Sequence, residues 1–70
     1  MAITYTAAIA QSENCWIGWV EEVPGVNSQG RSRDELMENL RDALAEALEM
    51  NRAEARAAAG EAYEEVSLVP

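Results

Sequence analysis

The 70-residue chain contains no histidine, no lysine and no phenylalanine, and Cys15 is its only cysteine. A single cysteine excludes an intrachain disulfide, and the absence of histidine removes the usual structural zinc sites. The common pairs of nucleophile and base are missing too, because Cys15 has no cationic neighbour in the sequence that would activate its thiol. We therefore expect no catalytic residues, no cofactor, no metal site and no enzymatic activity.

Positive charge is scarce. Five arginines stand against 13 Asp and Glu, which gives a formal net charge of -8. Nucleic-acid binding depends on Lys and Arg that neutralise phosphates, so we expect no direct binding of DNA or RNA. An acidic chain suits a basic protein partner, although the same charge is also found on small proteins that it merely keeps in solution.

Long apolar runs are absent as well. The start at residues 1–4 has no basic segment of a signal peptide, and no run approaches the roughly 18 apolar residues of a membrane span. We expect a cytoplasmic protein with a single domain over residues 1–70. A domain of this size buries only about 60% of its unfolded surface. With disulfides and zinc excluded, homo-oligomerisation is the stabilising device that remains.

Strand patterns fill the first half of the chain. Residues 2–10 alternate as in a half-buried strand, residues 11–14 are turn formers, and residues 15–20 suit the antiparallel return strand. Pro24-Gly25 has the composition of a type II turn, with glycine at the position that needs a positive φ. We expect residues 26–30 to form a short third strand.

A helix follows these strands. Ser32 and Glu35 have the spacing of a capping box, which predicts a helix that begins at about Arg33. We expect this helix to continue to about Ala58 and to be closed by Gly60, and the sequence leaves open whether it runs unbroken past Asn51. Its apolar stripe, which predicts the side that faces the core, comprises Leu36, Leu40, Ala43, Leu44, Ala47 and Leu48.

The last alternating segment, residues 63–69, predicts a fourth strand. The expected fold is therefore α+β, in the order β-β-β-α-β, with a three-stranded antiparallel sheet, a fourth strand and one helix packed on one face. A right-handed crossover would place the last strand beside the first, which gives the strand order 3-2-1-4.

The second strand is apolar on both faces. Trp16, Gly18 and Val20 alternate with Cys15, Ile17 and Trp19, so one set packs under the helix and the other lies on a bare face. Tryptophan is a preferred interface anchor, and we expect Ile17 and Trp19 to bind another polypeptide. The competing interpretation is that a loop or the end of the helix half covers Trp19.

Several segments, taken in their order and spacing, resemble the HicB antitoxins of bacterial type II toxin–antitoxin systems. They are residues 7–10, residues 14–26 with the apolar-Pro-Gly-apolar turn, residues 28–30, residues 32–36 with the Ser-x-x-Glu cap, and the pairs Asn39-Leu40 and Ala43-Leu44. The resemblance covers residues 3 to about 50, and residues 64–69 are similar to the fourth strand of that family.

The resemblance implies a partial ribonuclease-H-like fold without the catalytic carboxylates of the nuclease. It also implies a partner, a small basic HicA-like toxin that degrades mRNA until the antitoxin covers it. We expect Ile17, Trp19, Glu21 and Glu22 to contact this partner. Such antitoxins usually carry a C-terminal DNA-binding segment; because the sequence stops at Pro70, we expect no direct autorepression.

Two other functions stay open. One is a solitary HicB-like oligomeric scaffold or regulatory domain with no toxin partner, whose apolar face serves only self-association. The other is a degenerate nuclease, which the carboxylates of the helix argue against because their spacing fits a solvated helix face better than an acid and base pair. The sequence also leaves open the number of subunits, and whether self-association and toxin binding use the same face.

Overall fold

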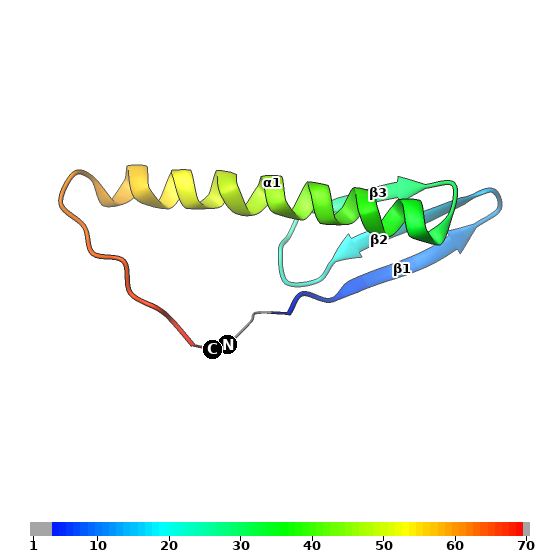
Figure 1. Ribbon diagram of the computed structural model, residues 1–70, viewed down its shortest axis with the longest axis horizontal. Coiled ribbons are helices and arrows are strands. Elements are labelled where there is room, and N and C mark those ends of the chain that lie inside the picture. Colours follow the sequence, from blue (N-terminus) through cyan, green and yellow to red (C-terminus); the bar gives the residue numbers. More distant parts are fainter. Residues whose placement is uncertain (1–3, 70) are drawn as a thin grey trace.

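The computed structural model describes residues 4–69 and consists of a three-stranded antiparallel sheet crossed on one face by one long helix (Figure 1). The strands are β1 (Ala7–Ser12), β2 (Cys15–Val20) and β3 (Asn27–Gly30), and the helix is α1 (Arg33–Ala59). The strand order is β1-β2-β3, so β2 is central and β1 and β3 are the edges. The α+β class, the three antiparallel strands and the single helix predicted from the sequence are confirmed.

The hairpin between β1 and β2 is tighter than predicted. Ser12 is paired with Cys15, so the turn contains only Glu13 and Asn14, and Glu13 has a positive φ of 31°. A two-residue turn needs such positive φ values because they match the twist of the flanking strands. The first strand therefore occupies Ala7–Ser12 instead of residues 2–10, of which residues 2 and 3 lie outside the described part.

The second turn agrees with its prediction. Gly25 has a φ of 88°, and the N–H of Val26 donates to the carbonyl oxygen of Val23 at 3.3 Å, as in a type II turn. The chain then enters β3 at Asn27, one residue later than expected. Val26 itself is buried at 7% exposure, where it belongs to the core below the helix.

The helix begins and ends where its caps predict. Ser32 has extended backbone angles, and its Oγ accepts a hydrogen bond from the N–H of Glu35 at 3.1 Å. At the other end Gly60 has a φ of 88° and its N–H donates to the carbonyl oxygen of Arg56 at 3.2 Å. The helix is continuous through Asn51, which answers the question that the sequence left open.

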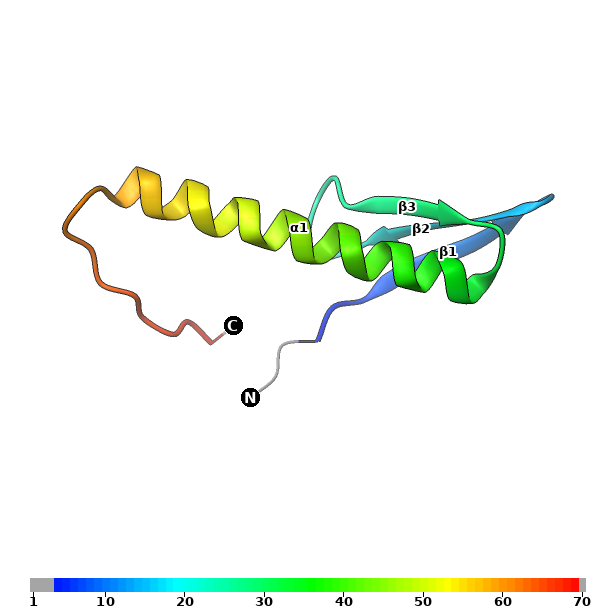
Figure 2. The same ribbon diagram turned by 45° about the horizontal axis from the view of Figure 1, so that its top comes forward.

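The core lies between α1 and the sheet. The buried apolar side chains are those of Val20, Val26, Leu36 and Leu40. Gly18, at the centre of β2, allows the helix to approach, because a Cβ at this position would lie 2.7 Å from Cδ1 of Leu40. The helix passes over β2 and β3, and β1 lies to one side of it (Figure 2).

The second half of the helix leaves the sheet. A helix of 27 residues is about 40 Å long, whereas a strand of six residues spans about 20 Å. Residues 49–59 are exposed throughout, and we call them the overhang. They account for the long dimension of the chain, which measures 51 Å.

The predicted fourth strand is not formed. Residues 61–69, here called the tail, are exposed and belong to no strand, so within residues 4–69 the sheet order is β1-β2-β3 and not 3-2-1-4. The overhang explains this difference, because it releases the tail beyond the end of the sheet (Figure 1). A strand needs the hydrogen bonds of a neighbouring edge, and alternation alone does not supply them.

Candidate interaction surface

The face of the sheet opposite the helix carries an apolar centre. In the strand register Trp19 lies opposite Ala8, and Ile17 lies opposite Ala10. Residues paired across an antiparallel ladder point to the same side of the sheet, which places these four side chains together. On β3 the residues in register with Trp19 and Ile17 are Asn27 and Gln29. We call this set the open face.

Trp19 is the dominant residue of the open face. It exposes 49% of its surface, whereas Ile17 and Cys15 are half-buried. Gly18 contacts the helix from the other face of the same strand, so the overhang, one of the two covers that the competing interpretation named, does not lie over Trp19. The two alanines on β1 are too small to shield the indole ring.

The surroundings of Trp19 resemble the centre of a protein interface. Apolar side chains from β1 and β2 form the middle, and the amides of Asn27 and Gln29 border it on β3. An aromatic anchor within a polar margin is the arrangement that concentrates binding energy in protein complexes. The carbonyl oxygen of Gln29 accepts a hydrogen bond from Nδ2 of Asn39 at 2.9 Å, which ties this border to the helix.

Glu21 and Glu22 follow β2 directly at the end that carries Trp19, and both are exposed. The backbone N–H of Glu21 donates to the carbonyl oxygen of Thr6 at 2.9 Å, and Oε1 of Glu22 accepts from the N–H of Thr6 at 2.7 Å. The hydrogen bond from the Thr6 N–H lowers the pKa of the Glu22 carboxyl from its ordinary value of 4.5. Glu22 therefore has a structural role, fastening the segment before β1, that the sequence did not reveal.

This hydrogen bond predicts a pH dependence. Because the pKa of Glu22 is lower in the folded chain, its stabilisation is complete above pH 4.5 and is lost as the pH falls through the lowered value. Glu22→Gln should therefore reduce the thermal midpoint at neutral pH, by a small amount because the site is exposed, and the difference should vanish in acid. Circular dichroism melting curves across this range measure it.

Glu21→Gln is the matched control, since only the backbone of Glu21 bonds to Thr6. It removes the same charge and should leave the pH dependence of wild type largely intact. Equal behaviour of the two variants would contradict the assignment to Glu22.

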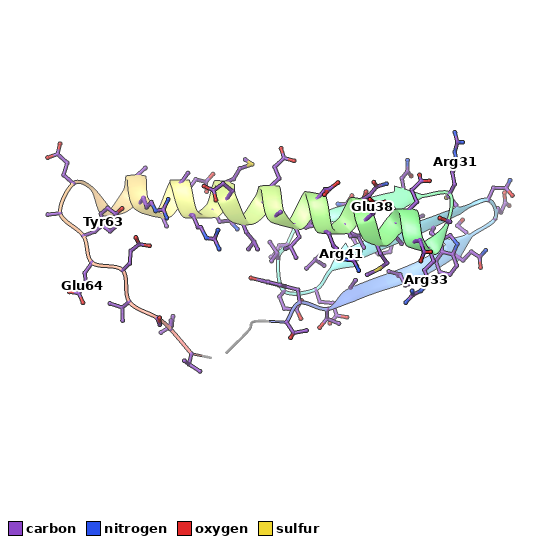
Figure 3. The ribbon with its side chains drawn as sticks, in the orientation of Figure 1. Arg31, Arg33, Glu38, Arg41, Tyr63 and Glu64 are labelled. Atoms are coloured by element: carbon purple, nitrogen blue, oxygen red, sulfur yellow. The ribbon has the colours of Figure 1, made fainter. Side chains whose placement is uncertain are left out.

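Two grooves lie away from the open face. The first, here called the edge groove, has a volume of about 390 Å³ and lies between the helix and residues 4–7, where the chain enters β1. Its lining includes Tyr5, Ala7, Met37, Arg41 and Leu44. Figure 3 shows Arg41 on the side of the helix that faces β1. The sequence reasoning missed this groove, although Tyr5 and Met37, apolar residues beside the predicted core, were a signal for it.

The second groove lies where the tail folds against the overhang. It is lined by Arg52, Arg56, Tyr63 and Glu65 among others, and Figure 3 shows Tyr63 beneath the end of the helix. An exposed ion pair joins Arg56 and Glu65 at 3.9 Å. Such pairs contribute little to stability, so the tail is held loosely at this point.

Within the described residues 4–69, no cluster of three or more potential ligand side chains is arranged to hold a metal ion. In the same part of the chain, α1 is not apolar enough to cross a bilayer. No family model matches the chain, and neither a curated protein nor a solved structure matches it. The open face and the resemblance seen in the sequence are therefore the two features that bear on function.

Proposed function

We propose that this chain is a non-enzymatic, HicB-like antitoxin module that acts in the cytoplasm and neutralises a small basic HicA-like toxin by covering it. The observation that carries the proposal is the open face, where Trp19 exposes 49% of its surface at the centre of an apolar patch. A binding module needs such an anchor, and it needs no catalytic group. The resemblance to HicB antitoxins supports the choice of partner.

Charge supports a basic partner. The chain has a formal charge of -8, and Glu21 and Glu22 are exposed beside Trp19. Opposite charge increases the rate of encounter, and the effect weakens as salt screens it. The buried contact would come from Trp19 and Ile17, and the two glutamates would orient the partner at the border.

The fold proposed for this function is the partial ribonuclease-H-like arrangement of the HicB family. Three antiparallel strands and a helix on one face are compatible with it. Residues 64–69 are similar in sequence to the fourth strand of that family. The catalytic carboxylates of a nuclease are not part of this proposal.

A second candidate is the solitary oligomeric scaffold. It is favoured by the small core, because only four apolar side chains are buried in the described chain, and a second copy on the open face would bury Trp19. The neighbouring genes separate the two functions. A small basic open reading frame that encodes a histidine, next to this gene, supports the antitoxin, and its absence supports the scaffold.

The direct test is co-expression with the tagged product of that neighbouring gene. Wild type should be retained with it, and Trp19→Asp should weaken binding by about 30-fold or more, as expected for an interface hot spot. Trp19→Phe is the control, since it keeps an aromatic ring at the site. Retention of Trp19→Asp at wild-type affinity would refute the proposed surface.

Sedimentation of the same variants tests the scaffold. If the open face serves self-association, Trp19→Asp should form smaller particles than wild type. An unchanged mass together with lost partner binding would assign the open face to the partner alone.

A further inference from the structure

The tail and the edge groove are complementary parts of one chain that the structure holds apart. We propose that the tail of one copy adds a strand to the outer edge of β1 in a second copy, with Val66 and Leu68 in the edge groove. The exchange is reciprocal and produces a two-fold dimer. It does not require the antitoxin function, because it uses the helix side of the sheet and leaves the open face free.

The tail has the alternating sequence of a strand, and its apolar side chains are exposed. Val66 and Leu68 expose 73% and 91% of their surfaces, and Val69 exposes 74%. In an extended strand residues two apart point to the same side, so Val66 and Leu68 would enter one groove together. Side chains this apolar are stabilised when another surface removes them from water.

The edge groove has the position that such a strand requires. The helix passes over β2 and β3, and the groove remains between residues 4–7, where the chain enters β1, and the helix side chains of Met37 and Leu44. Within residues 4–69 no strand is paired with the outer edge of β1. An added strand would satisfy this edge and point every second side chain below the helix.

Charge favours the same pairing. β1 has the sequence AAIAQS, without the charged residues that usually protect an edge strand from addition. Residues 66–69 are uncharged as well. Among the described residues that line the groove, Arg41 is the charged one, and the incoming tail carries Glu64 and Glu65 just before Val66.

The chain's own tail falls short of its own groove. Arg56 lies about 18 Å along the helix beyond Leu44, which marks the near end of the groove. Glu65 lies 3.9 Å from Arg56, and Leu68 is at most about 10 Å further along an extended chain. Leu68 therefore stops outside the groove as long as the tail rests on the overhang.

A second copy brings an edge groove within reach of the tail. If two overhangs lie side by side and antiparallel with the two-fold axis near Asn51, Ala59 of each helix lies level with Leu44 of the other, and Gly60 turns the tail toward the groove. The overall charge of -8 does not oppose this contact strongly. Residues 45–59 contain three carboxylates, Glu46, Glu49 and Glu54, against two guanidinium groups, Arg52 and Arg56.

Sedimentation equilibrium of the full chain tests the proposal. Wild type should have about twice the monomer mass of 7.7 kDa. Leu68→Asp, which places a carboxylate in the apolar groove, should weaken dimerisation by about 100-fold or more. Ser67→Asp is the matched control, because it adds the same charge on the other side of the same strand and should leave the mass unchanged.

Crosslinking distinguishes exchange between copies from a return of the tail to its own groove. In a Cys15→Ser background, Leu68→Cys combined with Met37→Cys should oxidise to a covalent dimer on a non-reducing gel. A disulfide formed only within the monomer would overturn the proposal.

Two further outcomes in sedimentation would overturn it, namely a monomeric wild type, or a dimer that Trp19→Asp dissociates and Leu68→Asp does not. Binding of Leu68→Asp to the basic partner tests the antitoxin function separately. Leu68→Asp should lose exchange and keep partner binding. A wild type that exchanges its tail but does not bind the basic partner would refute the antitoxin function alone, and a wild type that binds the partner as a monomer would refute the exchange alone.

Discussion

Replacing Leu40 with alanine should lower the free energy of unfolding by about 3 to 4 kcal/mol. Leu40 exposes only 2% of its surface and fills the space that Gly18 leaves open at the centre of β2. The described core contains only four buried apolar side chains, so the surrounding structure has few residues with which to close the cavity. Urea denaturation followed by circular dichroism measures the loss.

Met50→Ala is the matched control on the same helix. Met50 exposes 58% of its surface on the overhang, and its truncation should change stability by less than about 0.5 kcal/mol. Leu44→Ala should fall between the two, because Leu44 is half-buried. Equal losses at Leu40 and Met50 would show that the helix is not held by the sheet.

Gly30→Ala should destabilise the fold by about 3 kcal/mol, at the upper end for overpacking. A Cβ at this position would lie 2.6 Å from the backbone nitrogen of Leu36 and 3.0 Å from its Cα. A flexible side chain can move away from a new methyl group, but the first turn of a helix cannot. The same denaturation experiment shows the loss as a lower urea midpoint.

Two other glycines serve as controls for this steric argument. At Gly18 the nearest atom to a new Cβ is Cδ1 of the Leu40 side chain, at 2.7 Å, which has some freedom to adjust. At Gly25 no atom lies within 4 Å, and only the positive φ of 88° opposes alanine, at about 1 to 2 kcal/mol. A smaller loss for Gly30→Ala than for Gly25→Ala would contradict the predicted clash.

The two proposed surfaces would bind different partners. The open face with Trp19 is suited to a basic partner, and the edge groove with the tail is suited to a second copy. Because the two lie on opposite sides of the sheet, a dimer formed by strand exchange can present two open faces at once. Two linked binding sites increase the overall affinity for a partner that can engage both.

The local features of this chain were determined by its sequence. Ser32 and Gly60 predicted the ends of α1, Pro24-Gly25 predicted the turn before β3, and alternation in β2 placed Trp19 on the face opposite the helix. Each of these features depends on residues within a few positions of one another. Caps and turns depend on interactions between residues that are close in the sequence, and alternation follows from the geometry of a single strand.

Only the tertiary structure determined which residues that are distant in the sequence come into contact. Residues 63–69 have the alternation of a strand but lack a neighbouring edge, because the overhang carries them past the sheet. The bond from the Thr6 N–H to the Glu22 carboxylate joins residues 16 positions apart, and the edge groove forms between β1 and a helix that begins more than twenty residues later. Such contacts depend on how whole elements are placed relative to one another, which caps, turns and alternation do not encode.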